Sequence, residues 1–138
     1  QGDGNWRKGK NFEMLFSIAG AGPASLKVNG TEWLWRAPRP AFWRASTDND
    51  RGCGFPLRAA AWMAADVFVT YSGMKVLEAG PDCVKVQFQF GIPTVPGASA
   101  ELVYTVEAQG ALRWMRLPRR SGAPELPCFG VKFETFGR

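Results

Sequence analysis

The sequence of 138 residues contains no histidine. Histidine is the side chain that most often serves as a general base, activates a serine or cysteine nucleophile, or binds a transition metal. Its absence excludes the usual Ser-His and Cys-His mechanisms for this chain acting alone. Long apolar runs are also lacking, whereas a helix that crosses a bilayer needs about 20 consecutive apolar residues. We therefore expect no membrane span.

Cysteine is scarce. The three cysteines, Cys53, Cys83 and Cys128, are an odd number and include no Cys-x-x-Cys pair. A structural zinc site or a dithiol redox motif requires closely spaced pairs of cysteines. We therefore expect no metal site and three free thiols, which favours a reducing compartment such as the cytoplasm.

Positive charge exceeds negative charge, but without a concentrated basic region. The chain has 17 Lys and Arg against 12 Asp and Glu, a net charge of +5. The basic residues are scattered and are interrupted by proline and tryptophan rather than lying along one helix face. This distribution favours a solvated surface, or an interface with an acidic neighbouring domain, over nucleic-acid binding.

The length suits one domain, and an apolar content of 46% with 21% charged residues is typical of globular proteins. Residues 1–11 are polar and glycine-rich and are expected to be a linker, which leaves residues 12–138 for the domain. We expect one short helix at 57–65 and an irregular, proline-broken segment at 37–56. Strands are expected at 13–18, 24–28, 31–35, within 66–78, and at 83–90, 99–108, 111–117 and 127–135.

Two local patterns support this assignment. Residues 83–90 alternate between apolar and polar side chains, which is typical of a half-buried antiparallel strand. Asn29-Gly30 is a strong hairpin signal, because both residues of such a turn adopt positive φ. Short strands at fairly regular spacing predict an all-β antiparallel sandwich.

The sharpest polar cluster is Asp48, Asn49 and Asp50. On an extended segment, carboxylates two residues apart share a face at a separation of about 7 Å. This spacing is compatible with a glycosidase carboxylate pair or a hard cation, but a pair on one strand cannot flank a sugar, and a cation needs more oxygen ligands. The alternative, which we favour, is a structural cluster that hydrogen-bonds the backbone of the loop.

Aromatic side chains are concentrated in one part of the chain. Such a group suits stacking on sugar rings or on another protein, although most of its members are expected in the core. We expect Phe42 or Trp43 to face outward, because both lie beside prolines in the irregular segment. The group comprises Trp33, Trp35, Phe42, Trp43, Phe55 and Trp62.

The segment from Pro40 to Gly52, PAFWRASTDNDRG, resembles the signature Pro-x-Phe-Trp-Arg-Ala-Pro-Thr-Asp-Asn-Asp-x-Gly. This signature belongs to the small-chain domain of LacZ-type β-galactosidases in glycoside hydrolase family 2. Phe42, Trp43, Arg44, Asp48, Asn49 and Asp50 are its matching family residues. Ser46 departs from the pattern, which has proline there. Asn29-Gly30 and the segment 127–133 also resemble that domain.

The resemblance implies a β-supersandwich related to galactose mutarotase, of which this chain is the first half. It further implies that the two catalytic glutamates lie on a separate (β/α)₈ barrel, so that no catalytic residue is expected here. The expected partners are this barrel, the remaining half of the supersandwich and a β-galactoside sugar, in a homo-oligomeric parent enzyme. Such an enzyme is expected to use Mg²⁺ and Na⁺, with no cofactor in this chain.

Residues following the signature are expected to shape the rim of the active site. In the family, the loop that begins at the matching glycine lies at the mouth of the site, and two glycines would give it hinge freedom. The corresponding residues here are Gly52, Cys53, Gly54, Phe55 and Pro56. A different hypothesis is a free-standing carbohydrate-binding sandwich that uses exposed tryptophans as stacking platforms.

Overall fold

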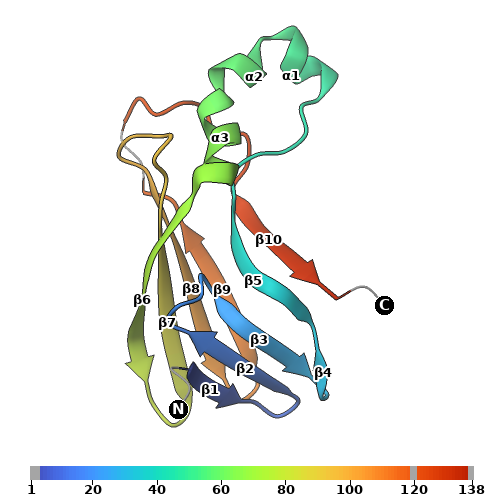
Figure 1. Ribbon diagram of the computed structural model, residues 1–138, viewed down its shortest axis with the longest axis vertical. Coiled ribbons are helices and arrows are strands. Elements are labelled where there is room, and N and C mark those ends of the chain that lie inside the picture. Colours follow the sequence, from blue (N-terminus) through green and yellow to red (C-terminus); the bar gives the residue numbers. More distant parts are fainter. Residues whose placement is uncertain (1–3, 119–120, 137–138) are drawn as a thin grey trace.

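The computed structural model describes residues 4–118 and 121–136. Ten strands and three short helices are assigned within these ranges, and all the paired strands are antiparallel. Figure 1 shows the strands in the lower part of the molecule and the helices together beyond one end of it. The expected all-β antiparallel sandwich is confirmed.

The first sheet contains four strands in chain order: β1 (Gly4–Lys8), β2 (Phe12–Ser17), β3 (Pro23–Val28) and β4 (Thr31–Glu32). The predicted turn between β3 and β4 is confirmed, since Asn29 has a φ of 51° and Gly30 a φ of 80°. Residues 4–8, which we expected within a linker, instead pair with β2. A strand can form there because edge pairing depends on backbone hydrogen bonds, to which a polar, glycine-rich composition is a poor guide.

The second sheet is a four-stranded meander of β6 (Thr70–Ala79), β7 (Cys83–Gly91), β8 (Ser99–Glu107) and β9 (Gly110–Arg116). The predicted alternation in β7 is confirmed, because Val84, Val86, Phe88 and Phe90 are all buried. Their neighbours in sequence face outward or are only partly covered. This sheet therefore contributes one apolar face to the core.

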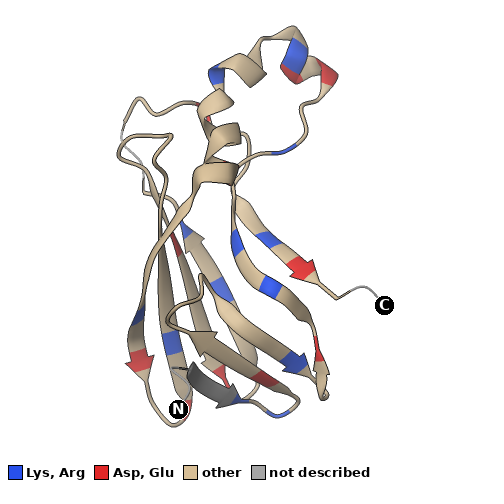
Figure 2. Ribbon diagram, viewed as in Figure 1, with Lys and Arg blue, Asp and Glu red and all other residues tan. Residues whose placement is uncertain are grey.

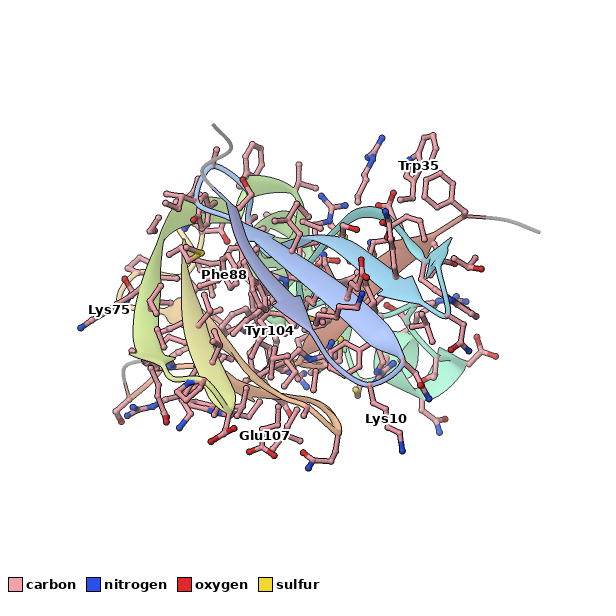
Figure 3. The ribbon with its side chains drawn as sticks, turned by 90° about the horizontal axis from the view of Figure 1, so that it is seen from below. Lys10, Trp35, Lys75, Phe88, Tyr104 and Glu107 are labelled. Atoms are coloured by element: carbon pink, nitrogen blue, oxygen red, sulfur yellow. The ribbon has the colours of Figure 1, made fainter. Side chains whose placement is uncertain are left out.

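The core lies between the two sheets. Phe16 on β2 is fully buried, and its ring centroid lies 6.0 Å from that of Phe88 on β7 and 5.7 Å from that of Tyr104 on β8. Figure 3 shows Phe88 and Tyr104 in the interior, whereas Trp35 projects outward. Aromatic contacts at these distances hold the sheets face to face.

A third, two-stranded sheet joins distant parts of the sequence, with β5 (Leu34–Ala41) paired to β10 (Gly130–Thr135). We expected an irregular segment from residue 37, but β5 continues through two buried prolines, Pro38 and Pro40. Among the strands of the described residues, β10 alone is hydrogen-bonded to β5, so the missing N–H groups of the prolines are tolerated, as on edge strands generally.

The helix expected at 57–65 is present as two separate helices, which together reach from residue 55 to residue 68. The helices are α1 (Asp48–Gly52), α2 (Phe55–Arg58) and α3 (Ala60–Phe68). The strand predicted within 66–78 begins only at Thr70, because the Ala-rich helix continues until Val69 N donates to Ala65 O at 2.9 Å. Among the described residues, no helix is long and apolar enough to span a membrane.

Candidate functional site: the helical arm

Residues 42–58 form what we call the helical arm, which connects β5 to α3 and contains α1 and α2 (Figure 1). All residues of these two helices are described, and none of them is buried. Of the large apolar residues whose exposure the structure describes, Leu57 is the most exposed, at 86%. Phe42, at the base of the arm, belongs to the core, and Trp43 and Phe55 pack against it. The rest of the arm projects from the sandwich, so that its surface is available to another molecule or domain.

The base of the arm is firmly attached. Phe42 is fully buried and stacks on Phe129, with centroids 5.8 Å apart and an interplanar angle of 11°. The Phe42 amide donates to Asp66 Oδ1 on α3 at 2.6 Å. Trp62, also on α3 and fully buried, lies 5.7 Å from the Phe42 ring and donates through Nε1 to Pro124 O at 3.0 Å. These contacts fix where the arm leaves the sandwich.

Local hydrogen bonds fold the arm into its first helix. Thr47 caps α1 in a capping box: its hydroxyl accepts from Asp50 N, and the Asp50 carboxylate accepts from Thr47 N at 2.8 Å. Arg44 donates to both Asp50 oxygens, at 2.6 and 3.2 Å. The Arg44 hydrogen bond, together with that from Thr47 N, holds the pKa of Asp50 well below its usual value. Figure 2 shows basic and acidic residues adjacent in this region.

The geometry expected for Asp48, Asn49 and Asp50 is wrong in one respect. These residues begin α1 rather than lying on an extended segment, so the two carboxylates do not share a face. The Asp48 side chain is 98% exposed and pairs with Arg51, whereas that of Asp50 is 16% exposed. The Asp50 contacts agree with the structural interpretation of the cluster. Among the described residues, no group of three or more His, Cys, Asp or Glu is arranged to hold a metal.

The segment from Gly52 to Pro56 forms a tight turn between two helices rather than an open loop. Gly52 ends α1, Gly54 adopts a φ of 70°, and Phe55 with Pro56 begins α2. Cys53 is exposed, and its carbonyl accepts from Arg58 Nη1 at 2.6 Å. Of the two glycines, only Gly54 adopts a positive φ. The conformational freedom that we expected both glycines to provide is therefore used only at Gly54.

The aromatic residues divide between core and surface. Phe42 and Trp62 are buried and Trp43 and Phe55 are partly buried, while Trp33 and Trp35 are 42% and 58% exposed. Trp43 is therefore more exposed to solvent than Phe42. This agrees with the expectation that one of the two residues faces outward. Trp35 meets Phe136 edge to face, with centroids 5.0 Å apart.

The sequence analysis did not identify Asp66 and did not place Cys128 at the base of the arm. Asp66 fixes the Phe42 amide, and Cys128 lies near both Asp66 and Arg44. Burial, followed by the charge of Asp66, raises the pKa of the Cys128 thiol, which lowers the share of the nucleophilic thiolate at neutral pH. Asp66 is the one charged residue in the otherwise apolar segment that forms α3, and this could have identified it. The sequence does not indicate that it accepts a hydrogen bond from the Phe42 amide.

Comparison with known proteins places the chain in a family. Residues 8–136 match the family described as "Beta galactosidase small chain". The chain is 38% identical to a β-galactosidase small subunit of Latilactobacillus sakei, over 91% of this chain and 46% of that protein. It is 34% identical to a β-galactosidase of Clostridium acetobutylicum, over 91% of this chain and 14% of that protein.

The matched region includes β2 to β10 and the whole helical arm, and reaches only the last residue of β1. The chain spans about half the length of the small subunit and a much smaller part of the longer β-galactosidase. The likeness therefore concerns a component domain of these proteins. On the evidence of this match, the chain belongs to the β-galactosidase small-chain family.

Proposed function

We propose that this chain is a non-catalytic domain of a β-galactosidase that hydrolyses terminal β-D-galactosides, and that its helical arm shapes the rim of the active site. The sandwich supports the arm, while the catalytic carboxylates lie on a separate barrel domain. The family membership and the relatives named as β-galactosidases support the proposal.

The observation that carries the proposal is the contrast between the two ends of the arm. Its base is fixed by the buried Phe42 ring and by the Asp66 hydrogen bond. Its tip presents Leu57 and the turn at Gly54 to solvent. An exposed apolar side chain on a rigidly held projection is suited to contacting another surface.

The arm would act by position rather than by chemistry. Phe55 begins α2 directly after the turn, and its ring is partly exposed. An aromatic ring at the rim can pack against the C–H face of a sugar and exclude water from the site. The internal hydrogen bonds of α1 keep the turn in one conformation, so little ordering is required when sugar binds.

A chimera tests this role in an intact enzyme. The segment of the Clostridium acetobutylicum β-galactosidase that matches this chain is replaced by the chain, and hydrolysis of o-nitrophenyl-β-D-galactoside is measured. We expect hydrolysis to be retained. In the chimera, Phe55→Ala is expected to raise KM by about tenfold, the effect of losing one apolar contact to substrate.

The matched control is Val76→Ala, which truncates a partly exposed side chain on β6 within the second sheet. It is expected to leave KM unchanged. A folded chimera without hydrolysis would contradict the domain assignment. Equal KM values for Phe55→Ala and the control would contradict the rim position of the arm.

The exposed pair Trp35 and Phe136 favours a second candidate function, sugar binding by the domain itself. Titration of the isolated chain with methyl β-D-galactoside, followed by tryptophan fluorescence, separates the two. A saturable change that is lost in Trp35→Ala supports a binding module. No change supports the first proposal, in which the sugar is held mainly by the catalytic barrel.

A further inference from the structure

A small polar hollow lies on the outer face of the second sheet, at the end of β6, β7 and β8 that follows α3. Its volume is about 230 Å³, which is less than the roughly 300 Å³ at which pockets for drug-sized ligands begin. Phe90 and Ala100 bury their side chains in the core, so these two residues contribute backbone to its lining. Its size suits one six-membered ring rather than a larger ligand.

Strand register brings the polar side chains of the hollow together. Gln89 on β7 lies directly opposite Glu101 on β8, and Gly91 lies opposite Ser99. Residues two apart on a strand share a face, so both pairs belong to the outer face of the sheet. An amide, a carboxylate and a hydroxyl therefore surround the bare backbone of Gly91.

A second hydroxyl reaches the hollow through an irregularity in β6. Tyr71 pairs with Phe90 and Gly73 pairs with Gln89, which leaves Ser72 as an extra residue between them. Such a β-bulge redirects a side chain, and bulges are over-represented beside functional sites. Ser72 lines the hollow, so the bulge adds its hydroxyl to the polar set.

Gly91 keeps the hollow open. A Cβ on this residue would lie 3.0 Å from Thr70 Oγ1 and 3.8 Å from Ser72 Oγ. Gly91 does not adopt a positive φ, so its backbone conformation does not require glycine. A glycine within a strand often marks a place where another molecule or backbone approaches closely.

The polar side chains of the hollow are available to a ligand. Within the described residues they form no ion pair or hydrogen bond with one another or with other groups, and Arg116, opposite Glu101 on β9, does not line the hollow. Hydroxyls and amides both donate and accept, whereas a carboxylate accepts only. One negative charge and no cation in the lining disfavour an anion, and the lack of apolar side chains disfavours an apolar ligand. The four side chains are those of Ser72, Gln89, Ser99 and Glu101.

An aromatic residue lies beside this end of the sheet. Phe68 ends α3 and is 59% exposed. It precedes Thr70 by two residues, a stretch of chain that spans at most about 7 Å, and Thr70 Oγ1 donates to Gly91 O at 3.5 Å. An exposed aromatic ring can pack against the C–H face of a sugar.

We propose that the polar hollow binds one pyranose ring of a neutral saccharide. Glu101 accepts hydrogen bonds from adjacent sugar hydroxyls, and Gln89 both donates to and accepts from the ring substituents. Gly91 forms the floor. The inference goes beyond the proposed function and does not rest on it, because the hollow belongs to the second sheet and not to the helical arm.

The test follows the backbone amide signals of the ¹⁵N-labelled chain by NMR during titration with methyl β-D-galactoside. No tryptophan lines the hollow, so fluorescence does not report on it. We expect saturable shifts at Gln89, Gly91 and Ser99 with a dissociation constant in the millimolar range, because a few hydrogen bonds at an open site offset little more than the cost of binding. Cyclohexanol, which has the same ring size but one hydroxyl, should not produce them.

Substitutions identify the groups that bind. Glu101→Ala is expected to weaken binding by about tenfold, and Gln89→Ala by about fivefold, because hydrogen bonds to a charged group are the stronger ones. Gln87→Ala is the matched control, since Gln87 lies on the same face of β7 but does not line the hollow. It should leave the dissociation constant unchanged. Thermal unfolding of each variant checks that it is folded.

The absence of saturable shifts at these residues would overturn the proposal. Equal shifts with cyclohexanol would also overturn it, as would equal effects of Glu101→Ala and Gln87→Ala in folded variants. Binding that is lost in Trp35→Ala but kept in Glu101→Ala would overturn it too, and would support the binding module at Trp35 and Phe136 instead. The readout involves no hydrolysis, so none of these results depends on the proposed role of the helical arm.

Discussion

Gly54 shows how one residue sets the shape of the helical arm. It adopts a φ of 70° in the turn between α1 and α2, and no heavy atom beyond its own residue and its chain neighbours lies within 4 Å of the position that a Cβ would occupy. The requirement for glycine is therefore conformational and not steric. Gly52, two residues earlier, also has open space around it but does not adopt a positive φ.

The two glycines provide a matched pair of variants. Gly54→Ala is expected to lower the free energy of unfolding by about 1 kcal/mol, because an L-residue is strained in the left-handed region. Gly52→Ala is expected to leave it unchanged or raise it by about 0.5 kcal/mol, because alanine restricts the unfolded chain and favours the helix. Urea unfolding of both variants measures the difference. Equal stabilities would contradict the conformational argument.

Sequence analysis identified the residues of this turn but not their conformation. The proline-broken segment expected at 37–56 was correctly distinguished from the strands from Phe42 onward, whereas residues 37–41 belong to β5. The sequence could not show that Asp48 begins a helix, because a helix of five residues is not stable by local propensity alone. The deciding interactions are the capping box and the Arg44 pairing, which depend on side-chain geometry.

At the scale of elements, α1 depends on the charge of Asp50. The carboxylate accepts from Arg44 and from Thr47 N, and the Arg44 bond is the main reason why its pKa lies below the ordinary value of 3.8. A carboxylate with a lowered pKa in the folded state stabilises that state at pH values above its unfolded pKa. This stabilisation is lost as the pH falls toward the folded pKa.

We therefore expect Asp50→Asn to lower the melting temperature by a constant amount between pH 7 and about pH 5. The difference from the unsubstituted chain should shrink below about pH 4, where the carboxyl of the unfolded chain becomes protonated. Circular dichroism melts across this range measure it. Asp48→Asn is the control, because Asp48 is 98% exposed and pairs only with Arg51 in the described structure. A difference that persists undiminished at pH 2 would contradict the linkage.

Strands with an alternating apolar pattern were predictable, whereas β1 and most of β5 were missed, because polar, glycine-rich or proline-rich composition does not indicate an extended backbone. The alternation in residues 83–90 identified β7, whose neighbours β6 and β8 precede and follow it directly. For β5, the prolines indicated an irregular segment, while its partner β10 lies far away in the sequence. Periodicity reports which face of a segment is buried, but it does not report which other segment supplies the hydrogen bonds.

At the scale of the whole molecule, the sandwich has apolar surface at an open edge. β9 is at the end of its sheet, and Leu112 and Trp114 on this strand are 67% and 42% exposed. An edge strand with unpaired backbone groups and apolar side chains favours association with another chain. We expect the isolated domain to self-associate through this edge.

Sedimentation velocity over a range of protein concentrations measures this association. The sedimentation coefficient should rise with concentration, and Leu112→Lys should reduce the rise, because a charge on an edge strand opposes pairing. Gln89→Lys is the control, since it adds the same charge on β7, which is not an edge strand. A coefficient independent of concentration, or equal effects of the two substitutions, would contradict the prediction.

The pairing of β5 with β10 also bears on the order in which the protein folds. Residue 40 pairs with residue 131, whereas β6 to β9 form successive hairpins between neighbouring segments. Contacts between distant residues form slowly, because closing a long loop costs entropy before the contact is made. During synthesis the hairpins can therefore form first, and β5 stays unpaired until β10 has left the ribosome. The ring of Phe42 acquires its stacking partner Phe129 only at that stage, so the helical arm is the part of the domain that matures last.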